Sequence, residues 1–138
     1  MGYTHYWNND EFTASEWQEL LLAAAAVFAS VRGKHIAIAG WDGKDKPTIT
    51  LDRISFNGRA PNDFETCAIN RTGDKFTFCK TGRRPYDLAV VALLVCASKI
   101  GPLQWSSDGD EEETREGREL AARVLENLPE MRLCKEAT

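Results

Sequence analysis

The segment 78–87, Phe-Cys-Lys-Thr-Gly-Arg-Arg-Pro-Tyr-Asp, holds the side chains best suited to binding an anion. Three of these are cations, Lys80, Arg83 and Arg84, in a chain that is acidic overall. We expect a strand to turn into a helix here. That turn would place the cations beside free backbone amides at the helix start, which favours a phosphate or carboxylate. The alternative is that the two arginines pair with acidic residues at 110–113.

An aromatic N-terminal segment, Tyr-Thr-His-Tyr-Trp, could contact a ring-shaped ligand. Strand alternation would place Tyr3, His5 and Trp7 on one face, and we expect an ordered edge strand. These side chains could stack on a nucleobase and orient it, or they could only pack the segment against the sheet. Trp41 and Trp105 are predicted to lie in loops, where each could line a pocket or cover the edge of the core.

Side chains for catalysis are few. The histidines are His5 and His35, and His35 is expected at the start of a strand rather than as a base. Cys79 is next to Lys80 and could act as a nucleophile if His5 were close. No catalytic triad is recognisable, and the phosphate-binding patterns GxxxxGKS, GxxxxGKT and GxGxxG are absent. We therefore predict no catalytic residue.

The cysteines indicate thiols rather than a metal site. They stand at 67, 79, 96 and 134, without a CxxC pair or a histidine at zinc-ligand spacing, so we predict neither a metal nor a cofactor. A hairpin that paired residue 71 with residue 75 would bring Cys67 opposite Cys79. This pair could be two small buried thiols or a regulatory disulfide.

Length and charge limit the possible functions. With 138 residues the chain has room for a single domain, and its net charge of -4 disfavours nucleic acid as a partner. Seven acids and two bases lie in the run 108–119. This run lacks the ligand positions of an EF-hand, and acids suit the start of a helix. The apolar runs are about half as long as a membrane-spanning helix requires, and no secretion signal is recognised, so we expect a cytoplasmic protein without a membrane partner.

Local signals predict the helices and strands. Thr13 and Glu16 form the pattern of a capping box, which begins a helix that should end at Gly33. Short β-rich segments separated by turn residues follow, and then a second helix. A third, amphipathic helix is expected over 110–128, ended by Pro129.

Together these elements predict an α+β fold over residues 1–138, with an antiparallel sheet of four to five strands, two buried helices and one C-terminal amphipathic helix. The apolar runs 20–29 and 88–97 have no polar face and must be covered on more than one side. We expect these two helices to pack on each other and also to form the interface of a homo-oligomer.

Five short motifs occur in combination: MGYTHYW at the start, GWDG at 40–43, FNG at 56–58, FCKT followed by RPYD within 78–87, and SDG at 107–109. In these motifs the chain resembles a family of small phage and bacterial proteins. The resemblance covers most of the chain and implies a phage or mobile-element setting. It implies no catalytic residue.

The hypothesis that unites these residues is a non-enzymatic binding protein, encoded by a phage and acting in the host cytoplasm. It would sequester a nucleotide-derived small molecule such as an antiviral signalling nucleotide. The residues expected at the phosphate are Lys80, Arg83 and Arg84. Those expected to stack on or orient the base and ribose are His5, Trp7, Trp41 and Tyr86. Asp87 or Asp108 is expected to accept from a hydroxyl group or to orient Arg83.

Two other classes of function remain open. The acidic run 108–119 could dock on a basic surface of a target protein, which would make the chain a direct protein inhibitor. Alternatively, His5 or Cys79 could serve in a small nucleotide hydrolase.

Overall fold

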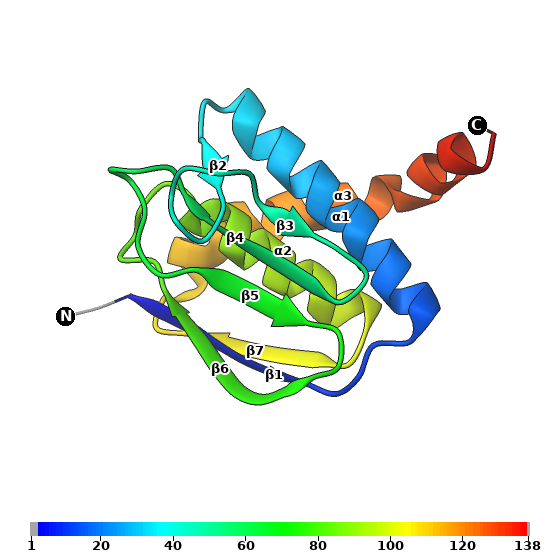
Figure 1. The fold of residues 1–138 in the computed structure, drawn as a ribbon, viewed down its shortest axis with the longest axis horizontal. Helices are drawn as coiled ribbons and strands as arrows, with labels where there is room; N and C mark the ends of the chain where they lie inside the picture. Colours follow the sequence, from blue (N-terminus) through cyan, green and yellow to red (C-terminus); the bar gives the residue numbers. More distant parts are fainter. Residues whose placement is uncertain (1–2, 138) are drawn as a thin grey trace.

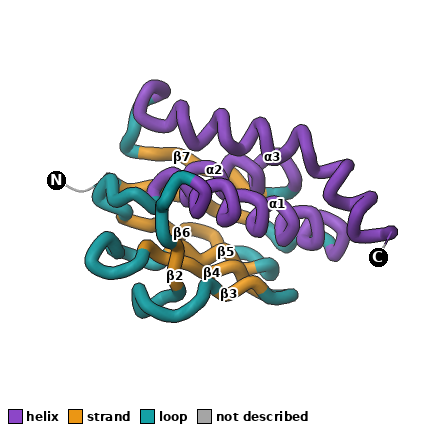
Figure 2. The backbone as a smooth tube through the Cα atoms, turned by 90° about the horizontal axis from the view of Figure 1, so that it is seen from above, coloured by secondary structure: helices purple, strands orange, loops and turns teal. Residues whose placement is uncertain are grey.

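The computed structural model describes residues 3–137, and side chains as far as Pro129. In chain order the elements are β1 (Thr4–Asn9), α1 (Ala14–Gly33), β2 (Ile38–Ala39), β3 (Thr48–Ile49), β4 (Arg53–Gly58), β5 (Cys67–Asn70), β6 (Asp74–Lys80), α2 (Asp87–Ile100), β7 (Leu103–Ser107) and α3 (Glu111–Ala137) (Figure 1). In the view of Figure 2, the helices lie together on one side of β2, β3, β4, β5 and β6, and β7 is drawn between α2 and α3. The predicted α+β class, with antiparallel strands and three helices, is confirmed.

The strands form two antiparallel sheets rather than one. In the first, β1 lies between β6 and β7. In the second, β4 pairs with β2, β3 and β5. The first sheet carries the N-terminal segment and leads directly into α2, so it is the sheet that positions the candidate site.

β1 is a central strand, and the expectation of an edge strand is therefore wrong. The reason is β7, which contains Trp105 and pairs Trp105 with Trp7. Trp105 was predicted in a loop because β7 is only five residues long and is flanked by turn-forming Gly-Pro and Asp-Gly pairs. The predicted alternation is present, since Tyr3, His5 and Trp7 are all buried.

The helix ends agree with the local signals at α1 but not at α3. Thr13 Oγ1 accepts a hydrogen bond from the Glu16 amide at 3.1 Å, and Glu16 Oε1 accepts one from the Thr13 amide at 2.8 Å, which confirms the capping box. α1 ends at Gly33 as predicted. α3 passes through Pro129 and continues to Ala137. A proline removes one backbone donor and crowds the preceding turn, but it does not by itself end a helix.

α2 lies at the centre of the core. It packs against α1, α3 and β7, and every residue from Ala89 to Ala97 is buried. A single chain therefore covers the apolar run 88–97, which removes the reason for expecting a subunit interface there. The run 20–29 packs on α2 as predicted and leaves only Ala25 and Ala29 exposed. Within residues 3–137, no helix has both the length and the apolar character needed to cross a membrane.

The contact between α2 and α3 depends on a glycine. A Cβ atom at Gly117 would lie 2.5 Å from Val91 Cγ1 and 2.6 Å from Val91 Cβ. Val91 is buried and β-branched, so it cannot turn away without a shift of the helices. Gly117 thus allows the two helices to approach closely beside the pocket described below.

We expect Gly117→Ala to lower the free energy of unfolding by about 1–3 kcal/mol, because overpacking at Val91 outweighs the higher helix propensity of alanine. Urea unfolding followed by circular dichroism measures this change. Gly33→Ala is the matched control, since nothing lies within 4 Å of a Cβ atom there. Equal effects of the two substitutions would contradict the close approach at Gly117.

Candidate functional site

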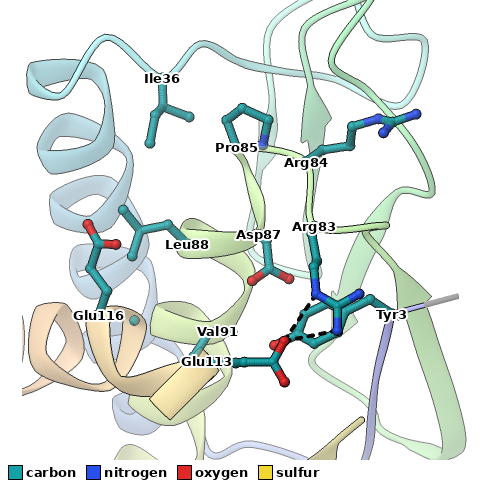
Figure 3. Close-up of a pocket in the computed structure, with 11 residues that line it drawn as sticks. Tyr3, Ile36, Arg83, Arg84, Pro85, Asp87, Leu88, Val91, Glu113 and Glu116 are labelled. Atoms are coloured by element: carbon teal, nitrogen blue, oxygen red, sulfur yellow. Dashed lines mark hydrogen bonds and ion pairs between the residues drawn. The ribbon is translucent and has the colours of Figure 1, made fainter. Parts of the chain in front are cut away.

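A pocket of about 370 Å³ lies where the start of β1, the turn before α2, α2 and α3 meet (Figure 3). Ile36, Leu88 and Val91 form its apolar wall. The charged residues that line it are Arg83, Arg84, Asp87, Glu113 and Glu116. The pocket thus combines the Arg83 guanidinium with three carboxylates, and Tyr3 adds an aromatic ring. Arg84 also lines the pocket, but its guanidinium is directed away from the other lining side chains (Figure 3).

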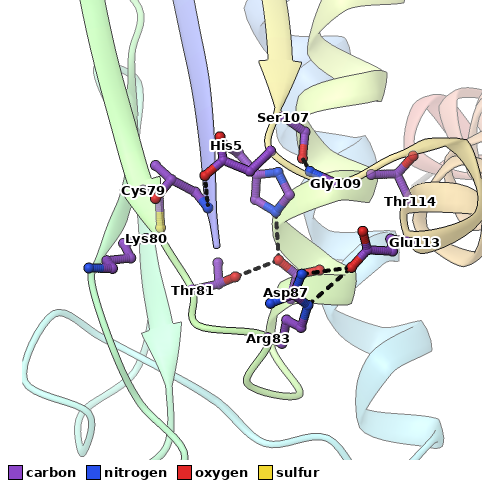
Figure 4. A network of polar contacts seen from close by, with 12 residues as sticks. His5, Cys79, Lys80, Thr81, Arg83, Asp87, Ser107, Gly109, Glu113 and Thr114 are labelled. Carbon is purple, nitrogen blue, oxygen red and sulfur yellow. Dashed lines mark hydrogen bonds and ion pairs between the residues drawn. The ribbon is translucent and has the colours of Figure 1, made fainter. Parts of the chain in front are cut away.

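Asp87 connects this pocket to two buried side chains (Figure 4). His5 Nε2 lies 2.5 Å from Asp87 Oδ1, and Thr81 Oγ1 donates to the same oxygen at 2.6 Å. His5 and Thr81 are fully buried, whereas the Asp87 side chain is 17% exposed. Among the described residues, Asp87 Oδ2 receives no hydrogen bond, so this oxygen can accept one from a ligand.

The strand register explains why these residues meet. His5 is opposite Cys79 in the ladder between β1 and β6, and Thr81 follows two residues later on the same face. The chain then turns through residues 82–83, which both have positive φ, and α2 begins at Asp87. The helix start is the positive end of the helix dipole, which stabilises the Asp87 carboxylate.

Two contacts hold Arg83 over the pocket. Its guanidinium carbon is 4.2 Å from the centre of the Tyr3 ring, and it donates to Glu113 Oε2 from Nε at 3.0 Å and from Nη2 at 2.9 Å. Burial raises the pKa of the Tyr3 hydroxyl, and the nearby Asp87 carboxylate raises it further. The alternative that an arginine pairs with an acid at 110–113 is confirmed for Arg83.

The backbone amides at the start of α2 are not free, so that part of the anion-site prediction is wrong. The amides of residues 87–89 donate to the carbonyl groups of residues 84–86 at 2.9–3.4 Å. The tight turn before the helix satisfies these donors itself. An anion in this pocket must therefore be held by side chains, and Arg83 and Arg84 are the cations that line it.

Lys80 does not line the pocket, although Arg84 does. Lys80 Nζ is 6.0 Å and Arg84 Cζ is 5.5 Å from the centre of the half-exposed Phe64 ring. Within the described part of the chain, neither cation forms an ion pair. Arg84 can therefore turn toward a ligand without breaking one.

Tyr86 and Trp7, both predicted to stack on a ligand, are core residues instead. Tyr86 is 1% exposed, and its hydroxyl donates to the Glu65 carbonyl at 2.5 Å. Burial raises the pKa of this hydroxyl. Trp7 is 2% exposed because it faces inward from the central strand β1. Both rings pack in the core. For Trp7 this confirms the alternative that the N-terminal aromatic residues only pack the segment against the sheet.

Trp41 and Asp108 are also separate from the pocket. The Trp41 side chain is 75% exposed in the loop between β2 and β3. Asp108 accepts from the Thr4 amide at 3.1 Å and from the Tyr6 hydroxyl at 3.0 Å, so it binds residues that alternate with His5 along β1. The structure therefore brings together Arg83, Arg84 and Asp87 from the predicted set, with His5 directly behind Asp87.

Three polar lining residues are absent from the predicted set of ligand-binding residues: Tyr3, Glu113 and Glu116. Tyr3 was considered for ring stacking, and Glu113 is one of the acids at 110–113 that were the alternative partners of the arginines. Tyr3 shares the inward face of β1 with His5, so strand alternation was a usable signal. Glu113 was attributed to the start of a helix, and its amide does donate to Asp110 Oδ1 at 2.8 Å. No local pattern indicates that α3 begins beside Arg83.

The other candidates for chemistry do not reach the pocket. Cys67 and Cys79 are buried free thiols, and Cys79 Sγ donates to the Glu65 carbonyl at 3.3 Å. They come from strands that pair elsewhere, β5 with β4 and β6 with β1, so the predicted hairpin ladder is absent. His35 lies in the turn after α1 with positive φ, not in a strand. Among the described residues, no group of three His, Cys, Asp or Glu side chains could hold a metal ion.

Comparison of the chain with protein families, with curated proteins and with solved structures found no match. The resemblance to small phage and bacterial proteins therefore stays a prediction. The pocket has to be interpreted from its own geometry.

We expect Asp87→Ala to lower the free energy of unfolding by about 2–4 kcal/mol, because it leaves the buried donors of His5 and Thr81 without an acceptor. Asp87→Asn keeps a carbonyl oxygen at this place and should cost less. Asp108→Ala removes an exposed acceptor and should cost about 1 kcal/mol or less. Urea unfolding measures the loss in the free energy of unfolding for the three variants and so ranks them. An effect of Asp87→Ala no larger than that of Asp108→Ala would contradict the network.

The buried thiols should not react in the folded protein. A hydrogen bond with Cys79 and burial raise the pKa of the Cys67 thiol, and burial raises that of Cys96 to about 12. Reactivity requires the thiolate and access to the reagent. We expect a Cys134→Ser variant to show no reaction with Ellman's reagent when folded and three reactive thiols in urea. Rapid reaction of the folded variant would contradict this arrangement.

Proposed function

We propose that this chain is a non-enzymatic binding protein for a nucleotide-derived small molecule, held in the pocket beside Tyr3, Arg83 and Asp87. The observation that carries the proposal is the combination of the Arg83 guanidinium, three carboxylates, an aromatic ring and an apolar wall around one cavity, with Arg84 on its rim. Sequestration of a signalling nucleotide, as in phage evasion of antiviral defence, is the role that a binder without turnover would serve.

The charges around the pocket favour a ligand with both acceptors and donors. A simple anion would meet the carboxylates of Asp87, Glu113 and Glu116 as well as the two arginines. A nucleotide carries a phosphate for Arg83 and Arg84, and it also carries ribose hydroxyl and base amino groups that donate to carboxylates. The free Oδ2 of Asp87 is one such acceptor.

The size of the pocket favours a small ligand. Its volume of about 370 Å³ is near the lower end of the range of about 300–1,000 Å³ that small-molecule sites occupy. One nucleotide unit suits this volume better than a cyclic dinucleotide or trinucleotide. The wall formed by Ile36, Leu88 and Val91 gives the uncharged part of such a ligand an apolar contact.

Binding without turnover is favoured over hydrolysis because the two candidate catalytic groups are enclosed. His5 is fully buried, and its Nε2 is already engaged with Asp87. Cys79 is fully buried as well. Neither side chain lines the pocket, so neither can reach a bound ligand without a rearrangement of the strands.

A direct protein inhibitor that uses the acidic run 108–119 is less well supported. Three of its acids face cations of the same chain: Glu112 with Arg115, Glu113 with Arg83, and Glu116 with Lys34. These pairs reduce the excess negative charge that a basic partner surface would recognise.

The test is to incubate the purified protein with a panel of linear and cyclic nucleotides, heat-denature it, and identify the retained compound in the filtrate by mass spectrometry. We expect one compound to be recovered unchanged. Isothermal titration calorimetry should show that Arg84→Ala raises its Kd at least about tenfold. Arg59→Ala, which removes an exposed arginine outside the pocket, is the matched control and should leave the Kd unchanged.

A converted product in the filtrate would overturn the non-enzymatic assignment in favour of the hydrolase. If no compound is retained, the proposal is overturned and the direct protein inhibitor becomes the favoured function. An equal effect of Arg84→Ala and Arg59→Ala would show that the ligand binds elsewhere.

A further inference from the structure

The start of α3 holds the side chain of Glu113 in a fixed position. Asp110 and Glu113 form a reciprocal pair, in which the Glu113 amide donates to Asp110 Oδ1 at 2.8 Å and the Asp110 amide donates to Glu113 Oε1 at 3.4 Å. This is the arrangement of a capping box. One oxygen of the Glu113 carboxylate thus serves the helix, and the other, Oε2, is directed at Arg83 (Figure 3).

Arg83 is equally constrained from its own side. Its backbone has a φ of 59°, in the left-handed region that non-glycine residues adopt at a cost of about 1 kcal/mol or more. The preceding turn and the stacking of the guanidinium on Tyr3 hold this conformation. The guanidinium is therefore presented at the pocket by contacts that do not involve Glu113.

The contact between the two side chains has the geometry of anion recognition. A single carboxylate oxygen, Glu113 Oε2, receives two donors of Arg83 at 3.0 and 2.9 Å. The Nε–Nη2 edge of the guanidinium, which can bind two oxygens of a phosphate, is thus turned toward an anionic oxygen. The Arg83 side chain is 60% exposed and that of Glu113 is 36% exposed. An ion pair this exposed contributes about 1 kcal/mol or less, which corresponds to about fivefold in a Kd. A competing anion can therefore replace Glu113, but only if its own contacts exceed this amount.

We propose that the Arg83 guanidinium is the subsite for the phosphate group of the ligand, and that the Glu113 carboxylate occupies this subsite until the ligand displaces it. This inference rests on the proposed function. It assigns opposite roles to Arg83 and Glu113. Arg83 binds the phosphate, and Glu113 competes with it.

Such a competitor gives selectivity against simple anions. Inorganic phosphate gains only contacts with the two arginines, and it has to displace Glu113 to obtain the one with Arg83. A nucleotide displaces Glu113 in the same way, but it also contacts the apolar wall and donates hydrogen bonds to Asp87. The occupied subsite therefore discriminates in favour of ligands that carry more than a phosphate group.

The test uses inorganic phosphate as the probe and Glu113→Gln as the variant. Glutamine retains the oxygen that the capping box needs and removes the charge, so the fold should be retained, which urea unfolding checks. We expect Glu113→Gln to lower the Kd for phosphate about threefold to fivefold, the factor that corresponds to the loss of an exposed ion pair, measured by calorimetry and by the shift of the Arg83 Nε resonance. Glu112→Gln removes a neighbouring exposed carboxylate outside the pocket and should change nothing. Adding Arg83→Ala to Glu113→Gln should abolish the gain.

An unchanged Kd for phosphate in Glu113→Gln would overturn the inference, as would a gain that persists without Arg83 or that also appears in Glu112→Gln. The outcome is separable from that of the proposed function. If Glu113→Gln gains phosphate but no nucleotide is retained by the wild-type chain, the subsite stands and the nucleotide assignment fails. If a nucleotide is retained but Glu113→Gln gains nothing, the nucleotide assignment stands and the subsite fails.

Discussion

The Asp87 carboxylate is the interaction on which the arrangement of this protein depends most. It accepts hydrogen bonds from His5 on β1 and from Thr81 just after β6, and it stands at the first residue of α2. One oxygen thus joins the central strand of a sheet, its neighbouring strand and the central helix. A buried imidazole and a buried hydroxyl both need this acceptor. If α2 left the sheet in another direction, both groups would lose their hydrogen bond. The pocket exists because that helix start is held against β1.

The charges around the pocket limit what it can bind. Two arginines alone would describe a general anion site, but α3 brings two glutamates to the same cavity, and Asp87 presents its second oxygen there. Opposite charges in one small cavity favour a ligand with matching opposite groups, and they disfavour a bare anion or a bare cation. The segment 78–87 supplied the cations in the sequence analysis. Two of the carboxylates that change its meaning come from α3, where Glu113 pairs with Arg83 across 30 positions of the sequence.

Features encoded within a few residues were predictable, and features that depend on distant pairing were not. The capping box at Thr13 and the end of α1 follow from local chemistry and are present. The inward face of β1 follows from alternation and is also present. The central position of β1 could not be predicted, because it depends on β7, whose five residues resemble a loop. In the same way, the partner of Arg83 was one of two open alternatives until the position of α3 was known.

The central position of β1 also has a consequence for how the chain acquires its structure during synthesis. β1 is made well before one of its partners, β7, and the contact between Thr4 and Asp108 spans 104 positions. The first sheet therefore cannot be completed before β7 has left the ribosome. Such distant pairing slows folding, and the edge of β1 that pairs with β7 stays unpaired until β7 has been made. A nascent chain of this kind has a window in which a chaperone would find an unprotected strand.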